Sequence, residues 1–299
     1  MIPPPCTPVC PRYAVGMSVV HIIGANGRSG AALTRALLAR GTRCVPIVRN
    51  PQRWSADLPG TPRIATIGTS ALQGALADAT RIVSCAHARH IPDILAASPP
   101  EAQFVFLGST RKFTRWPDAH GDGVLAGERA FQASRRPGVL LHPTMIYGAQ
   151  GEDNVRRLAA LLRRLPLVPL PGGGRALVQP IHQHDLTAAI LAALDTTWSV
   201  PESFVIAGPT PLPYADFTRA IAHAAHLSPP RIVPIPAALL LALAPLTRIP
   251  GLPTIRAAEI RRLLEDKAFD ITPARVKLGF NPMALDAGLA LTFGAPPCP

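Results

Sequence analysis

Three glycines at fixed spacing, directly after a short apolar run, constrain this chain more than any other feature. Residues 19–23 are apolar and rich in β-branched side chains, Gly24, Gly27 and Gly30 follow, and an Ala- and Leu-rich segment covers 31–40. This order predicts a strand, a tight turn and a helix, in which the glycines allow the turn, the approach of a ligand to the backbone and close helix–strand packing. Because a helix start presents N–H groups and the positive end of its dipole, the pattern predicts a loop for a dinucleotide's diphosphate. The plainer interpretation is an ordinary glycine-rich turn.

The composition allows a large buried core and argues against several classes of protein. The 299 residues are 48% hydrophobic and 16% charged, which suits one large α/β domain, or a large domain with a smaller one, and excludes disorder along the whole chain. The net charge of +12 comes almost entirely from arginine. No block of basic residues and no basic strip interleaved with aromatics occurs, so nucleic-acid binding is not predicted. The charge would suit an anionic substrate or an anionic surface.

Cysteines and the ends of the chain narrow the cellular setting. Five cysteines without a C-x-x-C pair argue against a disulfide framework or a zinc site and favour a reducing, cytoplasmic environment. Residues 1–16 are proline-rich and lack the apolar core of a signal peptide, so we expect a disordered N-terminal extension. The longest later apolar stretch, 237–244, is too short for a transmembrane segment. It predicts a buried or domain-packing helix, with an interfacial membrane helix as the alternative.

Strand-like and helix-like patterns alternate along the first half of the chain. The expected strands are 19–23, 43–48, 64–67, 81–86, 103–107 and 139–142, and the expected helices between them are 31–40, 70–77, 91–97 and 127–134. The strands are nearly continuous apolar runs, as in a parallel sheet covered by helices on both faces.

This alternation predicts an α/β fold: a Rossmann-type, doubly wound parallel sheet with a smaller, mainly helical C-terminal lobe. We expect residues 17–150 to form the NAD(P)-binding core. Residues 151–299 are expected to complete that core and to form the C-terminal lobe. In the later part, 177–186 is expected to be a short strand leading into a helix capped by Asp185.

Four segments together resemble a known family, from about residue 18 to 294. They are the glycine loop at 24–30, Leu-His-Pro-Thr-Met-Ile-Tyr-Gly at 141–148, Gln-Pro-Ile-His-Gln-His-Asp-Leu at 179–186 and Phe-Val-Ile-Ala-Gly-Pro at 204–209. The chain resembles atypical extended short-chain dehydrogenase/reductases of the NAD-dependent epimerase/dehydratase group. Within that group it is similar to the NADPH-binding accessory subunit of respiratory complex I.

The resemblance implies a Rossmann core with a nicotinamide dinucleotide across the carboxyl ends of its strands and a C-terminal lobe over an unknown small-molecule substrate. It places the nicotinamide near residues 143–145. The cofactor-binding residues implied in this way are Gly24, Asn26, Gly27, Arg28, Gly30, Arg49, Ala86, Pro143 and Thr144.

Residues at the end of the second strand favour NADP over NAD. An NAD site usually has a carboxylate there for the ribose hydroxyls, whereas this chain has Arg49 and Asn50 and no carboxylate before Asp57. Arg49 and Arg28 would suit a 2′-phosphate. The alternative is that both arginines are solvated surface residues of an arginine-rich chain.

The usual catalytic pair of the family, Tyr-x-x-x-Lys, is missing. The chain's tyrosines are Tyr13, Tyr147 and Tyr214, and none has a lysine four residues later. Aligning Gly127-Glu128 with the family's Gly-Glu registers His120 with the usual tyrosine and Val124 with the lysine.

Histidine can move protons near neutral pH, so a site of Ser109 and His120 is one hypothesis, and a solvated, inert loop histidine is the other. Tyr147 is placed near the expected cleft, to contact substrate or to pack in the core. His142 replaces an arginine common in the family, and we expect that to alter the charge preference for substrate.

Two further groups are open to more than one interpretation. Arg111, Lys112, Arg115 and Trp116 line an anionic pocket or are plain surface charge. His182 and His184 beside Asp185 have no third ligand nearby, so we expect a structural role and no metal site.

Two functions therefore compete at this point. One is an NADP-dependent oxidoreductase or epimerase with altered proton donors. The other is a non-catalytic NADP(H)-binding scaffold or assembly protein with a protein partner. A weaker third hypothesis is a binder of anionic surfaces through the basic charge and the helix at 237–244.

Overall fold

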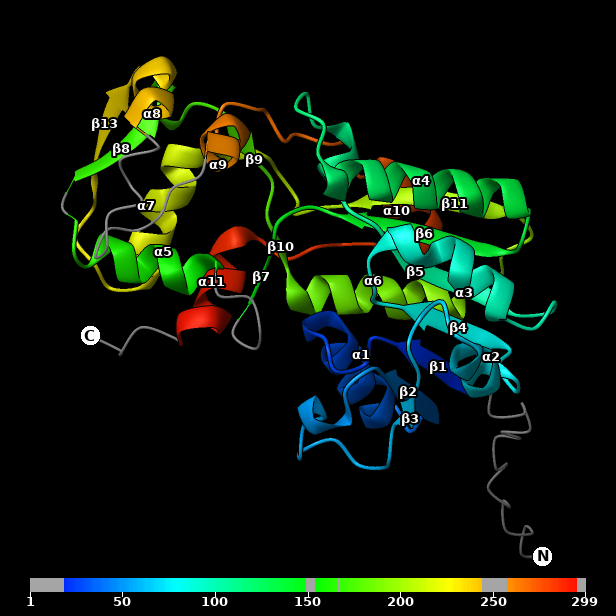
Figure 1. Cartoon of the computed structure of the whole chain (residues 1–299). Coiled ribbons are helices and arrows are strands. Elements are labelled where there is room, and N and C mark those ends of the chain that lie inside the picture. The colour runs from blue at the N-terminus through cyan, green and yellow to red at the C-terminus, as the bar shows by residue number, and fades with distance from the viewer. Residues whose placement is uncertain (1–18, 149–153, 166, 244–256, 295–299) are drawn as a thin grey trace, which may run out of the picture.

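The computed structural model describes residues 19–148, 154–165, 167–243 and 257–294, and it contains a seven-stranded sheet with helices on both faces beside a smaller lobe (Figure 1). The sheet order is β11-β6-β5-β4-β1-β2-β3, and every neighbouring pair is parallel. The strands are β1 (Val20–Ile23), β2 (Cys44–Val48), β3 (Arg63–Ile64), β4 (Arg81–Ser84), β5 (Gln103–Leu107), β6 (Gly138–Pro143) and β11 (Pro201–Ile206). The Rossmann-type α/β prediction is confirmed.

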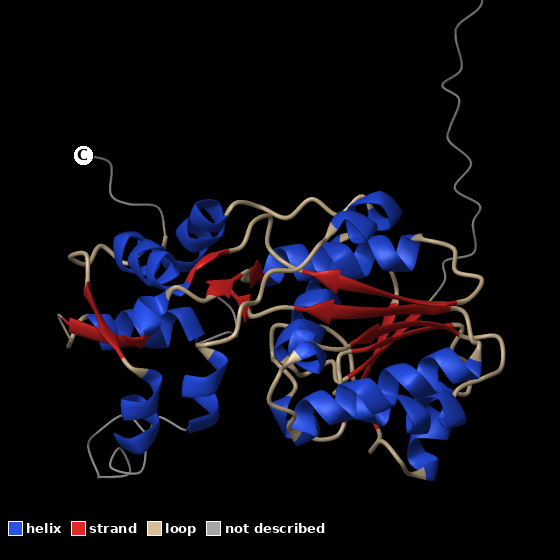
Figure 2. Cartoon of the chain, turned by 90° about the horizontal axis from the view of Figure 1, so that it is seen from above, coloured by secondary structure: helices blue, strands red, loops and turns tan. Residues whose placement is uncertain are grey.

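Two helical layers enclose the sheet, which is seen nearly edge-on in Figure 2. One layer contains α1 (Arg28–Ala39), α6 (Gln183–Asp195) and α10 (Thr272–Leu278), and the other contains α2 (Ser70–Leu76), α3 (Ile91–Ala97) and α4 (Ala119–Ser134). Since α6, α10 and β11 come from the second half of the chain, that half supplies part of the core.

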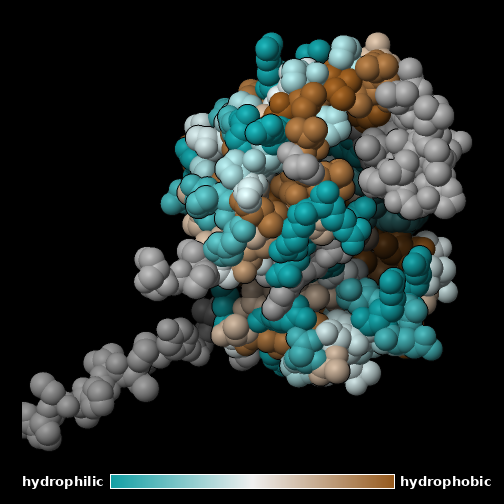
Figure 3. Space-filling model, turned by 90° about the vertical axis from the view of Figure 1, so that its left-hand side faces the viewer, coloured by the Kyte–Doolittle hydropathy of each residue, from teal (hydrophilic) through white to brown (hydrophobic). Residues whose placement is uncertain are grey.

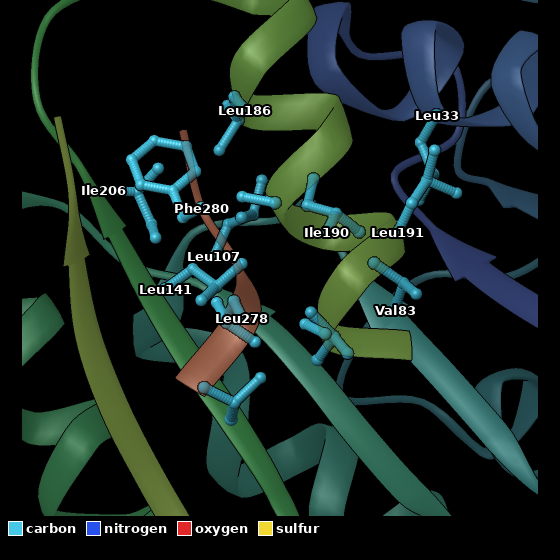
Figure 4. Packing of buried hydrophobic residues seen from close by; sticks show 14 of the residues in the cluster. Leu33, Val83, Leu107, Leu141, Leu186, Ile190, Leu191, Ile206, Leu278 and Phe280 are labelled. Carbon is cyan, nitrogen blue, oxygen red and sulfur yellow. The ribbon is translucent and has the colours of Figure 1, made fainter. Parts of the chain in front are cut away.

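Side chains of each central strand alternate between the two layers. In β5, Val105 and Leu107 belong to the core cluster under α1 and α6, whereas Phe104 and Phe106 belong to the cluster under α3 and α4. Both sets are buried, which explains why the strands read as continuous apolar runs in the sequence. Figure 4 shows how α6 lies across the strands, its apolar side chains over theirs: Leu186, Ile190 and Leu191 above Val83, Leu107 and Leu141.

The smaller lobe combines helices with short paired strands. Its helices are α5 (Asn154–Leu162), α7 (Tyr214–Ala224), α8 (Ala237–Leu243), α9 (Ala257–Arg262) and α11 (Leu285–Phe293). Its strand pairs are β7 (Ile146–Tyr147) with β10 (Ile181–His182), β9 (Leu177–Val178) with β12 (Leu212–Pro213), and β8 (Leu167–Pro171) with β13 (Arg231–Ile235). Across the described ranges, no helix combines the length and the apolar character needed to cross a membrane.

Several local expectations differ from the structure. The third strand is only Arg63–Ile64, and the helix expected at 127–134 already begins at Ala119, because Asp118 accepts hydrogen bonds from the amides of His120 and Gly121. The start of α6 is capped by His182, whose ring accepts from the amide of His184, and not by Asp185. Asp185 instead accepts from the Met283 amide, 3.1 Å away, and so ties α6 to a distant segment. The expected N-terminal extension, 1–16, lies outside the described residues.

Candidate functional site

The first and last glycines of the loop are required for different reasons. Gly24 has a φ of 75°, in the left-handed region that favours glycine. A Cβ on Gly30 would lie 2.3 Å from the carbonyl oxygen of Gly24 and 2.8 Å from the Cα of Ala25, and a Cβ on Gly27 would lie 3.2 Å from the same oxygen. The turn therefore needs glycine for its conformation at one end and for contact between helix and strand at the other.

The loop lies at the carboxyl end of β1, between β2 and β4, where the order of the strands reverses. Ligands of open α/β sheets bind in the crevice at such a point. No side chain caps the start of α1, and its first turn carries no acidic residue, so the positive end of the helix dipole is not neutralised there. Asn26 donates to the Asn50 carbonyl at 3.2 Å, which ties the loop to the end of β2. Ala86 borders it on the other side, since a Cβ on Gly24 would lie 3.4 Å from the Ala86 nitrogen.

The end of β2 carries no carboxylate, and the first one beyond it is already engaged. Arg35 of α1 donates to Asp57 at 2.8 Å. Hydrogen bonds from Arg35 and then Ser55 lower the pKa of Asp57 to about 2. Arg49 is exposed. The first residue after β2 is thus an exposed cation.

A cavity of about 500 Å³ lies beyond the carboxyl ends of β5 and β6, between the sheet and the smaller lobe. Its wall is partly aromatic and apolar and partly charged. The lining residues from the core are Ser109, Thr110, Arg111, Phe113, Thr114, Thr144 and Met145. Those from the smaller lobe and its connections are Asn154, Val178, Gln179, Tyr214, Arg262, Leu263, Glu265, Asp266, Lys267 and Phe269. Such a mixture of apolar surface and a few polar groups is typical of a small-molecule site.

Hydrogen bonds fix the part of the wall that follows β5 and β6. The Ser109 hydroxyl accepts from the Arg111 amide at 3.2 Å, and Thr110 donates to the Pro143 carbonyl at 3.3 Å. Thr144 donates to the Gln179 carbonyl at 2.5 Å. These bonds hold the residues after β5 against the turn after β6, so Ser109 and Thr144 are presented on the same wall.

His120, the expected partner of Ser109, contacts a second histidine. It lies in the first turn of α4, is exposed, and is absent from the cavity wall. Its ring packs edge-on against the ring of His87, with 4.3 Å between centroids. Burial, with the nearby His120 and Arg89, lowers the pKa of His87 to about 4, and burial and Arg111 also lower the pKa of His120. Both rings are therefore neutral at physiological pH.

A largely buried ion cluster joins the residues after β5 to α4 and β6, and sequence analysis did not foresee it. Lys112 Nζ lies 2.7 and 2.6 Å from the two carboxylate oxygens of Glu128 and 3.2 Å from Nε2 of His142. From the sequence we expected His142 to alter the charge preference for substrate. The side chain is instead 1% exposed and belongs to this cluster, not to the cavity wall. Val124, which stands in the register of the family's lysine, is 1% exposed within the apolar core.

The two described tyrosines have different environments. Tyr147 is buried, and its hydroxyl donates to the Leu285 carbonyl at 3.4 Å, which assigns it to the core of the smaller lobe. Tyr214 lines the cavity instead. Burial raises the pKa of Tyr214, so its hydroxyl stays protonated and offers a hydrogen-bond donor.

The cavity's far wall is tied to the residues after β5. Glu265 is buried and accepts hydrogen bonds from the Thr114 hydroxyl, at 3.0 Å, and from the Arg115 amide. Of the four residues expected to line an anionic pocket or lie on the surface, Arg111 lines the cavity and Lys112 lies in the ion cluster. Arg111 also pairs with Asp118. Within the described ranges, no group of three or more His, Cys, Asp and Glu side chains is placed to hold a metal.

Comparison with solved structures finds close similarity of shape at low sequence identity. UDP-glucose 4-epimerase of Thermotoga maritima, solved with UDP-glucose, superposes with a TM-score of 0.71 at 14% identity over 93% of this chain and 98% of that one. UDP-glucuronic acid 4-epimerase of Bacillus cereus, in complex with UDP-glucuronic acid and NAD, gives 0.69 at 17% over 93% and 98%. A short-chain dehydrogenase/reductase superfamily protein of Agrobacterium tumefaciens with bound NAD gives 0.68 at 16% over 93% and 95%.

The chain has the fold of these enzymes. At such identities the likeness shows the fold alone, and it extends over nearly the whole length of each protein. A scan against protein-family models finds no match, and a search of curated proteins finds none either. The expected similarity to the complex I subunit gains no support from these comparisons.

Proposed function

We propose that this protein binds a nicotinamide dinucleotide, NADP(H) in preference to NAD(H), and acts as an oxidoreductase or epimerase on a small molecule held in the cavity. The observation that carries the proposal is the glycine turn at the point where the strand order reverses, which a Cβ at Gly30 would obstruct. The uncapped start of α1 supports an anion there. The neighbours described as NAD complexes share this fold, which further supports the cofactor class.

Residues of this chain can be assigned to the diphosphate, the adenosine end and the nicotinamide end of such a cofactor. Gly24, Gly27 and Gly30 with the start of α1 would hold the diphosphate, and Arg28 and Arg49 the adenosine end. Asn26 would keep the loop against β2, and Ala86, Pro143 and Thr144 would border the nicotinamide end. When bound, the nicotinamide supplies hydride transfer. The protein's part is to orient the ligand, to exclude water and to place proton donors.

Coenzyme preference can be measured through Arg49. We expect Arg49→Ala to weaken NADPH binding about tenfold and to leave NADH binding unchanged, because a charge-assisted bond to the 2′-phosphate is lost. Isothermal titration calorimetry with both coenzymes gives the answer. Arg43→Ala is the matched control, since Arg43 is also exposed but precedes β2. Equal losses for both coenzymes, or none, would show that Arg49 does not read the phosphate.

For the substrate we propose an anionic or polar metabolite of the nucleotide-sugar type. Three cations, Arg111, Arg262 and Lys267, outnumber the two carboxylates of the cavity wall, those of Glu265 and Asp266. Phe113, Phe269 and Tyr214 supply apolar and stacking surface. Neighbours with this fold were solved with UDP-glucose and UDP-glucuronic acid, which supports testing that class first.

Ser109 is the residue that we propose to bind the reacting oxygen, with His120 as a second candidate for proton transfer. We expect Ser109→Ala to lower turnover about 100-fold without changing NADPH affinity, as for the loss of one well-placed donor. His120→Ala is measured beside it, in a panel of carbonyl compounds and nucleotide sugars with NADPH or NADP. A change below about twofold in His120→Ala would remove His120 from the mechanism, because acid–base groups contribute about 100-fold or more. Unchanged turnover in Ser109→Ala would remove Ser109.

A non-catalytic role is the second candidate function, and one observation favours it. The chain has no Tyr-x-x-x-Lys pair, and the position expected for the lysine is the buried Val124. In that case NADP(H) would stabilise a scaffold or assembly protein, as the resemblance to the complex I subunit implies. Tight NADPH binding with no turnover across the whole panel would support this function, and any turnover that Ser109→Ala abolishes would exclude it.

A further inference from the structure

We propose that the far end of the smaller lobe docks on an anionic phospholipid bilayer. This end, here called the distal face, consists of the β8–β13 ribbon, the residues after α5 and the beginning of α8. It lies on the side of the lobe away from the seven-stranded sheet, at the left of Figures 1 and 2. The proposal concerns a surface that the nucleotide site and the cavity do not use.

The distal face is positively charged and built from sequence without carboxylates. Residues 163–184 and 220–243 contain no Asp or Glu. Arg163, Arg164 and Arg231 are exposed on it. Each arginine near an anionic membrane surface contributes favourably to binding, because the net negative potential of that surface attracts positively charged side chains.

Large apolar side chains project from the same face. Leu165, Leu167 and Leu239 are 40%, 50% and 49% exposed, and Val233 is 36% exposed. In the ribbon, Leu167 stands opposite Arg231 and Val233 opposite Pro169, all exposed, whereas the intervening Val168 is buried. One side of the ribbon is therefore turned outward. Figure 3 looks onto this end and shows apolar side chains gathered toward its top.

A groove at one end of the ribbon joins the two kinds of side chain. It has a volume of about 690 Å³ and is lined by Leu162, Arg163, Leu165, Leu167, Leu227, Ser228, Pro229, Pro230 and Arg231. Arginine beside leucine and proline suits an amphiphile, whose anionic headgroup would meet Arg163 and Arg231 while its acyl chain lies against the leucines.

The opposite end of the ribbon leads into α8, whose sequence, Ala-Ala-Leu-Leu-Leu-Ala-Leu, contains only apolar residues. Ala238 and Leu239 are exposed. A helix that is apolar all round is normally buried in protein or in lipid. At seven residues α8 is too short to cross a bilayer, so it would lie at the boundary between headgroups and acyl chains.

A bilayer fits this face better than another protein surface does. Apposition of two copies of the face would bring arginine against arginine with no carboxylate from these segments to pair with them. An acidic protein would satisfy the arginines but would leave leucines at both ends of the ribbon and the apolar α8 to be matched separately. A lipid surface supplies both chemistries everywhere along the ribbon.

Vesicle flotation of the full chain tests the proposal. The probes are vesicles of phosphatidylcholine alone and vesicles in which roughly one third of the lipid is phosphatidylglycerol. We expect binding to the anionic vesicles only, weakening as salt rises. Arg163→Glu/Arg231→Glu should lower the partition coefficient at least tenfold, because each arginine is worth about fivefold near such a surface. Leu165→Ser/Leu167→Ser should lower it by a similar factor.

Arg43→Glu/Arg129→Glu is the matched control, because it changes net charge equally at two exposed arginines of the core. It should keep most of the binding, and NADPH affinity and thermal melting should confirm that all three variants are folded. Equal loss in both arginine variants would reduce the effect to net charge and overturn the proposal. Binding to polyglutamate or an acidic protein without binding to anionic vesicles would overturn it in favour of a protein partner. Unchanged vesicle binding by the leucine variant would also overturn it, because the apolar side chains would then not contact the bilayer.

Discussion

A Gly30→Ala variant is expected to lose nicotinamide-dinucleotide binding at least 100-fold and to unfold more easily than the parent. The added methyl would lie 2.3 Å from the Gly24 carbonyl oxygen, and both groups belong to backbone that cannot move aside alone. The helix must shift away from β1, which opens the turn and disorders the loop that we propose to hold the diphosphate. Overpacking of this kind costs about 1–3 kcal/mol of stability. Calorimetry with NADPH and urea unfolding measure the two effects.

Gly74→Ala is the control for that experiment. Gly74 lies in α2, a Cβ there meets nothing within 4 Å, and its φ is not in the left-handed region. Alanine should therefore raise stability by about 0.5–1 kcal/mol and leave NADPH binding unchanged. Undiminished NADPH binding by Gly30→Ala would refute the phosphate-loop assignment, and with it the proposed function.

Removal of Glu128 is expected to give the second large effect. In Glu128→Leu, Lys112 and His142 stay in a protein interior without their carboxylate, whose oxygens lie 2.6 and 3.3 Å from them. Breaking a buried pair by removing one partner costs about 3–5 kcal/mol, whereas replacing both partners by apolar residues is often nearly neutral. Lys112→Met/Glu128→Leu should therefore recover most of the loss in urea unfolding. A double variant as unstable as the single one would show that the ion cluster is not what stabilises this region.

The same cluster predicts how stability depends on pH. Burial alone would raise the pKa of Glu128, but hydrogen bonds from His142 and Lys112 outweigh it and lower the pKa to about 2. Since the folded pKa lies below the unfolded one, near 4.5, the carboxylate stabilises the protein above that pH. This stabilisation is lost as the pH falls from about 4.5 towards 2. Burial also lowers the pKa of His142, so stability should begin to fall below pH 6.5. The Lys112→Met/Glu128→Leu variant should lack the acid component.

Much of the fold could be predicted from local pattern. The continuous apolar runs at β1, β2, β4, β5 and β6 indicate strands whose two faces are both covered, and the structure places all of them in the parallel sheet. The boundaries were less predictable where side chains bind backbone. Asp118 starts α4 eight residues before its expected beginning and His182 caps α6, because a single side-chain oxygen or nitrogen satisfies the first amides of each helix.

The candidate site also combines features that the sequence shows with features that only the structure shows. The glycine turn and the missing carboxylate after β2 are properties of neighbouring residues, and the sequence shows both. The cavity is different, because its wall joins Ser109, Tyr214 and Phe269, which are far apart along the chain. Sequence analysis therefore named Ser109 but neither Tyr214 nor Phe269 as a wall residue, and it could not foresee that His120 packs against His87.

The amino-acid sequence by itself determined the glycine turn after β1, the alternation of strands and helices and the absence of a Tyr-x-x-x-Lys pair, since each depends on the order of nearby residues. Only the tertiary structure decided that Lys112, Glu128 and His142 form one buried cluster and that the residues around the cavity share one wall. The physical reason is that backbone conformation responds to neighbours along the chain. The pairing of distant charges and the shape of a cavity depend on how the sheet and the smaller lobe pack together.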